Sequence, residues 1–76
     1  MSVKRPSPID RRLGARLRAM RRSRGMTQTA LGTALGVSFT QVQKYERGKD
    51  RISVSRLFQI AKALDAEVES LLEGVG

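Results

Sequence analysis

Glycines divide the centre of the chain into short segments that each show the apolar spacing of a helix. Gly25, Gly36 and Gly48 end three successive amphipathic stretches, and glycine is common where a helix terminates in a left-handed conformation. No stretch alternates apolar and polar residues for long enough to form a strand. The sequence of 76 residues therefore predicts one small all-α domain of short helices joined by tight turns.

Residues that cap helices well precede four of the five predicted helices. Ser7 and Asp10 have the spacing of a capping box ahead of the first helix, and Thr27, Ser38 and Ser53 stand ahead of the next three. A fifth, weakly capped helix begins near residue 68. The expected core consists of the apolar residues at helical spacing: Ile9, Leu13, Leu17, Met20, Ala30, Leu31, Ala34, Leu35, Val37, Val42, Tyr45, Leu57, Ile60, Ala61 and Leu64. The apolar residues of the fifth helix are Val68, Leu71 and Leu72.

The composition excludes several functional classes. The chain has no cysteine and no histidine, which removes disulfides, the usual zinc ligands and every Ser–His or Cys–His catalytic pair. No phosphate-binding loop or cluster of acids is visible, so we expect neither an enzyme nor a metal or cofactor site. The apolar runs are too short to cross a membrane, and no signal peptide is recognisable. We therefore expect a cytoplasmic, nucleoid-associated protein.

Positive charge is concentrated at the front of the chain. Residues 1–24 hold nine basic and one acidic residue, whereas residues 57–76 hold one basic and four acidic residues. This asymmetry favours a polyanionic partner that approaches from one side, although charge that serves only solubility remains an alternative. We expect a flexible basic arm over residues 1–6, a folded domain over 7–73 and a loose tail over 74–76. Basic residues that could follow a phosphate backbone or enter a minor groove, or simply be solvated, are Lys4, Arg5, Arg11 and Arg12, followed along the first helix by Arg16, Arg18, Arg22 and Arg24.

The second and third predicted helices, joined by the short turn at Gly36, have the layout of a helix-turn-helix. Val42 and Tyr45 would turn the apolar side of the third helix, at about residues 38–47, toward the core. The opposite side would then carry Phe39, Thr40, Gln43, Lys44 and Arg47. A helix of this kind fits the DNA major groove. Phe39 could contact a thymine methyl group, or instead fold back over the second helix or meet a partner subunit.

Four stretches carry a resemblance to a known family: L-R-A-M-R-R-S-R-G-M-T-Q (17–28), A-L-G-T-A-L-G-V-S (30–38), Q-V-Q-K-Y-E-R-G-K (41–49) and L-F-Q-I-A-K-A-L (57–64). In their order and spacing they resemble the Cro/repressor-type, or Xre, helix-turn-helix family. The resemblance implies a compact, lambda-repressor-like domain of five helices. It also implies that Arg21 pairs with Glu46, which would fasten the first helix to the end of the third.

The resemblance also implies roles for residues around the third helix. It implies base contacts from Ser38, Phe39, Thr40 and Lys44, with Gln43 beside them. It implies phosphate contacts from Thr27, Gln28, Arg47, Lys49 and Arg51. The chain departs from the family at two places: Phe39 cannot brace the side chain of Gln28 as a polar residue would, and the loop after Gly48 lacks the usual proline, so that we expect Ile52 to fill the core there.

These observations predict a sequence-specific, double-stranded-DNA-binding transcriptional regulator of the repressor type. One domain reads only a few base pairs, so we expect a homodimer on a palindromic site. Candidate dimer residues, which could equally belong to the core, are Val68, Leu71, Leu72 and Val75. The alternative is an antitoxin-like module that binds a protein through its acidic C-terminal helix and regulates its own gene. No partner is expected in a membrane.

Overall fold

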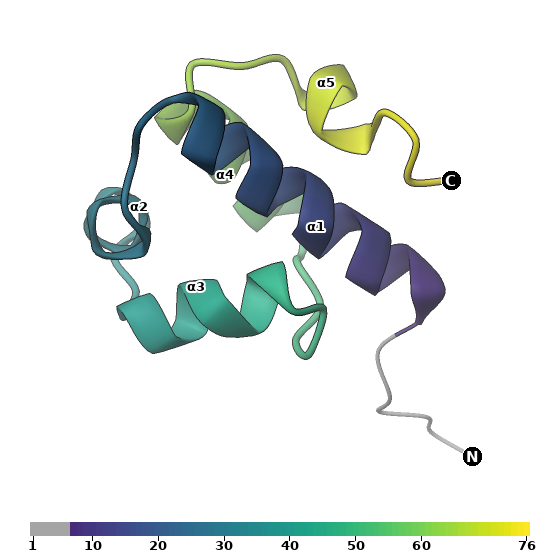
Figure 1. Ribbon diagram of the computed structural model, residues 1–76, viewed down its shortest axis with the longest axis horizontal. Helices are drawn as coiled ribbons and strands as arrows, with labels where there is room; N and C mark the ends of the chain where they lie inside the picture. Colours follow the sequence, from purple (N-terminus) through teal and green to yellow (C-terminus); the bar gives the residue numbers. More distant parts are fainter. Residues whose placement is uncertain (1–6) are drawn as a thin grey trace.

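Five helices make up the computed structural model, which describes residues 7–76 and contains no strand within them. They are α1 (Pro8–Ser23), α2 (Gln28–Leu35), α3 (Phe39–Glu46), α4 (Val54–Ala63) and α5 (Val68–Leu72). In Figure 1, α1 crosses the front of the molecule, α4 lies behind it, and α2 and α3 lie to one side. The all-α prediction is confirmed, whereas the expected basic arm lies outside the described residues.

The helices begin where the capping residues predict. The Ser7 side chain accepts a hydrogen bond from the Asp10 backbone N–H at 3.2 Å, and the Asp10 carboxylate accepts one from the Ser7 N–H at 2.8 Å, which completes the capping box. Thr27, Ser38 and Ser53 each cap the next helices through their hydroxyl oxygens. As the sequence indicates, α5 has no side-chain cap.

One central core joins all five helices. Its most deeply buried side chains are Leu17, Leu31, Val42, Ile60, Leu64 and Leu71. α2 packs against α3 and α4, while α1 packs against α3 and α5. Ile52 contributes a partly buried side chain from the loop before α4, in place of the missing proline. Because α3 is held by both α1 and α2, its orientation is fixed by the core of the whole domain.

Two glycines are required for different reasons, Gly36 for its backbone conformation and Gly14 for a close contact between helices. Gly36 ends α2 in the left-handed conformation with φ of 74°, which allows α3 to start only a few residues later. Gly14 lies in the middle of α1, where a Cβ atom would come within 2.7 Å of the Glu46 carbonyl oxygen at the end of α3. Gly14 weakens α1 locally but permits this contact between α1 and α3.

Three expectations, two about apolar residues and one about the end of the chain, are wrong. Ile9 is 51% exposed, because the first turn of α1 extends past the elements that cover Leu13 and Leu17. The tail over 74–76 is not loose: Val75 is buried, and its carbonyl oxygen accepts a hydrogen bond from Arg12 Nε at 2.9 Å. Ala30 and Ala34, expected in the apolar stripe of α2, are exposed. Leu72 is exposed as well, so of its two predicted places, the dimer surface and the core, the core is excluded. Since Leu71 and Val75 are core residues, neither is free to form a dimer surface.

Candidate nucleic-acid interface

The outer side of α3 is the most distinctive exposed surface of the domain. Val42 and Tyr45 are buried, so the side chains between them and before them point outward. Phe39 keeps 51% of its surface exposed although it is aromatic. The predicted base-reading residues lie together on this side: Ser38, Phe39, Thr40 and Lys44 are exposed, and Gln43 is half-buried. The arrangement presents hydroxyl, amide, ammonium and aromatic groups on one short helix.

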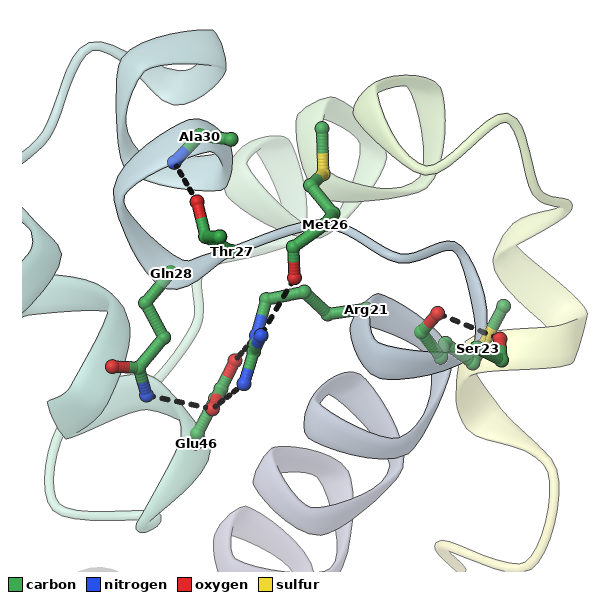
Figure 2. A network of polar contacts seen from close by, with 8 residues as sticks. Arg21, Ser23, Met26, Thr27, Gln28, Ala30 and Glu46 are labelled. Atoms are coloured by element: carbon green, nitrogen blue, oxygen red, sulfur yellow. Dashed lines mark hydrogen bonds and ion pairs between the residues drawn. The ribbon is translucent and has the colours of Figure 1, made fainter.

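A buried ion pair fastens this helix to α1. Arg21 and Glu46 are only 8% and 7% exposed. Arg21 Nε and Nη2 donate to the two carboxylate oxygens of Glu46, at 2.5 and 3.1 Å, and Arg21 Nη1 donates to the Met26 carbonyl oxygen at 2.7 Å (Figure 2). This is the pair that the family resemblance implies. Its bidentate geometry fixes the end of α3 relative to α1 and to the turn before α2.

Gln28, at the start of α2, is held by the same carboxylate. Its Nε2 donates to Glu46 Oε1 at 3.0 Å, and Figure 2 shows the amide reaching Glu46 from α2 while its oxygen points away. The sequence predicts that Phe39 leaves Gln28 without a brace, but Glu46 supplies one. Thr27, the residue before, is exposed and caps α2 at the end where backbone N–H groups favour an anion.

The loop between α3 and α4 carries the other predicted phosphate contacts. Arg47, Lys49 and Arg51 are all exposed. The loop is anchored by the Gln41 side chain, which donates to Asp50 Oδ2 at 2.9 Å, and by the Lys49 N–H, which donates to the Lys44 carbonyl oxygen.

Arg51 is also drawn toward the start of α1. Its Nε lies 3.5 Å from Asp10 Oδ2. The Ser7 backbone N–H holds the pKa of Asp10 below its ordinary value of 3.8, and the charge of Arg51 acts in the same direction. A phosphate bound by Arg51 would therefore compete with Asp10.

The arginines of α1 fall into two groups that the sequence does not distinguish. Arg12, Arg16 and Arg24 donate through Nε to the backbone carbonyl oxygens of Val75, Ser70 and Leu64, at 2.8 to 2.9 Å. These three arginines attach α1 to the C-terminal part of the chain. Arg12 is predicted to belong to the basic arm, but its Nε is engaged by the Val75 carbonyl oxygen. Lys4 and Arg5 lie outside the described residues.

The second group of α1 arginines lies toward α3. Arg11 is exposed and its backbone lies against Gly48, while Arg18 and Arg22 line hollows that also contain Glu46. The sequence groups Arg18 with the other α1 arginines that could follow a phosphate backbone and does not place it beside Glu46. Its position three residues before Arg21, on the same side of the helix, is the signal that points there.

Other kinds of site find no support in residues 7–76. They contain no group of acidic side chains arranged to hold a metal ion. Nor does any helix among them combine the length and apolarity that crossing a bilayer requires.

A domain of five helices in which a capped, outward-facing α3 follows α2 through a short turn is a helix-turn-helix domain, a class of DNA-binding modules. The family model described as helix-turn-helix matches residues 17–71. The chain belongs to this Xre-type helix-turn-helix family, whose members are DNA-binding transcription regulators.

Known proteins similar to this chain are regulators of the same type. An uncharacterized HTH-type transcriptional regulator, y4wC of Sinorhizobium fredii, is 46% identical over 70 residues, which cover 92% of this chain and 49% of that protein. The chain spans about half the length of the curated relatives it matches.

Solved structures with the same fold include two regulators. The restriction-modification controller protein C.AhdI from Aeromonas hydrophila has a TM-score of 0.76 and 33% identity, over 80% of this chain and 92% of that one. The P22 c2 repressor in complex with a synthetic operator has a TM-score of 0.72 and 34% identity, over 82% and 94% of the two chains. These similarities confirm the predicted family and the lambda-repressor-like fold.

Proposed function

We propose that this chain is the sequence-specific, double-stranded-DNA-binding part of a transcriptional repressor, which reads the major groove with α3. The observation that carries the proposal is the orientation of α3. Val42 and Tyr45 on its apolar side are buried, and its outward side presents Phe39, Thr40 and Lys44. An aromatic ring can contact a thymine methyl group, and a hydroxyl group can hydrogen-bond to donors or acceptors on base edges. An ammonium group can donate to the acceptors of guanine. Bound to the chromosome, the protein would be cytoplasmic and nucleoid-associated.

The phosphate contacts in this proposal flank α3 on both sides. Thr27 and Gln28 would contact the backbone from the start of α2, and Arg47 and Lys49 from the far end of α3. Gln28 is suited to this role because Glu46 engages one amide hydrogen and leaves the other for a phosphate oxygen. Such contacts would fix the position of α3 in the groove, while its outward side chains select the sequence.

Selection of bound sites from random DNA tests this function. We expect an enriched palindrome whose half-sites lie about 34 Å apart, or a multiple of that distance. Affinity for that palindrome should exceed affinity for random DNA by at least about 10³-fold. A protein that enriches no sequence above random DNA would contradict the proposal. Repression, as opposed to activation, would then be tested with a reporter gene behind the selected site.

We also propose that the DNA-bound form is a homodimer joined through a groove between α4 and α5. The groove has a volume of about 640 Å³ and includes Phe58, Val68 and Leu72. Phe58 and Leu72 are 59% and 43% exposed, which is unusual for side chains of this size. Lys62 lies along the same groove as Glu67 and Glu69, so a second copy related by a two-fold axis would bring opposite charges together around an apolar centre.

A further inference from the structure

A small polar cavity opens where α1, α2 and α3 meet. Its volume is about 240 Å³, and it is lined entirely by polar side chains: Arg18, Gln28, Gln43, Glu46 and Arg47. Gln43 and Arg47 belong to the outward side of α3 and its end, so the cavity lies directly beside the predicted base-reading residues. It differs from the apolar groove between α4 and α5 both in position and in lining.

The charge balance of this cavity is positive. The Glu46 carboxylate is already neutralised by Arg21 and accepts hydrogen bonds from Arg21 Nε, Arg21 Nη2 and Gln28 Nε2. Within residues 7–76, neither Arg18 nor Arg47 has a carboxylate at ion-pair distance or a hydrogen-bond acceptor for its side chain. Two guanidinium groups thus face a polar hollow without a negative counterpart, which is the chemistry of an anion site.

Arg18 is distinguished from its neighbours on α1 by this lack of a partner. Arg12, Arg16 and Arg24 each donate to a backbone carbonyl oxygen, which the fold itself supplies. Arg18 instead lines the polar cavity together with Glu46 and also borders a second hollow that contains Arg22 and Glu46. The folded domain therefore leaves the Arg18 guanidinium on the side of α1 that faces α3.

We infer that Arg18 and Arg47 together bind one backbone phosphate of the DNA, so that α1 contributes directly to the interface. The phosphate would lie between the two guanidinium groups, with the remaining amide hydrogen of Gln28 within reach. This inference rests on the proposed function. It adds a contact from a third helix to those expected from α2 and α3, and it assigns the phosphodiester as the ligand of the cavity.

The salt dependence of DNA binding tests the assignment. Each phosphate contact contributes about 0.9 to the slope of log K against log salt. We expect Arg18→Gln to reduce that slope by about 0.9 per subunit, or about 1.8 for the proposed homodimer, and to weaken binding to preferred and random DNA alike. The matched control is Arg16→Gln, which removes the same charge from another side of α1, where the guanidinium donates to the Ser70 carbonyl oxygen, and should leave the slope within about 0.3 of that of the original protein. Equal slopes for the two variants would overturn the assignment.

Modified DNA locates the contact. Neutral methylphosphonates are placed one at a time around the half-site, and binding is compared for the original protein and for Arg18→Gln. We expect one position at which the modification weakens the original protein but leaves the variant unaffected. If every position weakens both proteins equally, the inference is wrong. The melting temperature of each variant, measured without DNA, verifies that the fold is retained.

Two further outcomes separate the possible failures. If the cavity binds a free anion, inorganic phosphate at constant ionic strength would stabilise the original protein but not Arg18→Gln. If phosphate acts in this way while Arg18→Gln leaves the salt slope of DNA binding unchanged, the DNA contact is refuted. If the original protein binds DNA selectively while Arg18→Gln behaves identically, only this inference fails. If the original protein binds no DNA at all, the proposed function fails with it.

Discussion

Single residues around Glu46 determine how α3 is held. Breaking a buried ion pair leaves a charge without compensation, which costs about 3–5 kcal/mol. We therefore expect Arg21→Ala to lower the free energy of unfolding by about that amount, measured by urea denaturation. The matched control is Arg22→Ala on the exposed side of α1, which should change stability by no more than about 0.5 kcal/mol. Equal losses for the two variants would mean that the pair contributes nothing specific.

Asp10 gives the domain a predictable response to acid. The Ser7 N–H, with Arg51 adding to its effect, lowers the pKa of Asp10 below 3.8 in the folded protein. A lowered pKa stabilises the fold above the ordinary pKa, and the stabilisation disappears as pH falls through the lowered value. We expect the original protein to exceed Asp10→Asn in unfolding free energy at pH 7, and the difference to shrink as pH falls from 3.8 through the lowered pKa. The unfolding free energies of both proteins are measured by denaturation between pH 7 and pH 2. A difference between them that does not change with pH would contradict this account.

At the scale of the helices, the packing of α1 on α3 depends on Gly14. Alanine normally favours a helix interior over glycine by about 1 kcal/mol. At this position, however, the added Cβ would press on the carbonyl oxygen of Glu46, and overpacking costs about 1–3 kcal/mol. We expect Gly14→Ala to destabilise the protein, as measured by its unfolding free energy. A stabilised variant would show that α1 and α3 can separate at little cost.

The division of labour between α3 and the loop that follows it can also be measured. Lys44 lies on the outward side of α3, and Lys49 lies in the exposed loop. Losing a base contact costs about 1–3 kcal/mol on the preferred sequence, so Lys44→Ala should weaken binding to preferred DNA more than to random DNA. Lys49→Ala should weaken both alike. The affinities of both variants for preferred and random DNA are measured by titration. If the two variants lose affinity for the two DNAs in the same proportions, the proposed roles of Lys44 and Lys49 are contradicted.

The starts and ends of the helices could be predicted because their signals are local. Ser7, Thr27 and Ser53 lie within three residues of the N–H groups they cap, and a sequence displays such spacings directly. The burial of Val75 and the partners of the α1 arginines could not be predicted, since Arg12 meets a carbonyl oxygen 63 positions away. The partner of Gln28 depends in the same way on three helices coming together. The DNA-contacting roles stay predictions.

For the molecule as a whole, the proposed dimer through the groove between α4 and α5 would link DNA recognition to assembly. A charged residue in an apolar contact removes the free energy gained by burying a large side chain, which is about 1.5–3 kcal/mol. This loss corresponds to a roughly tenfold or greater rise in the dimer Kd. We expect this for Leu72→Glu in sedimentation equilibrium. Val54→Glu makes the same change at an exposed residue outside the groove and should preserve the dimer. A protein that is monomeric both in solution and on DNA would contradict the homodimer and favour the antitoxin-like alternative, with its separate protein partner.

The three arginines that attach α1 to the C-terminal part of the chain do so by donating hydrogen bonds to main-chain carbonyl oxygens rather than to side chains. Every residue type supplies such an oxygen. The exposed positions of α5 can accordingly be replaced without detaching the helix from the domain. A regulator built in this way can acquire a new subunit preference by surface substitution while α3 keeps its place in the fold.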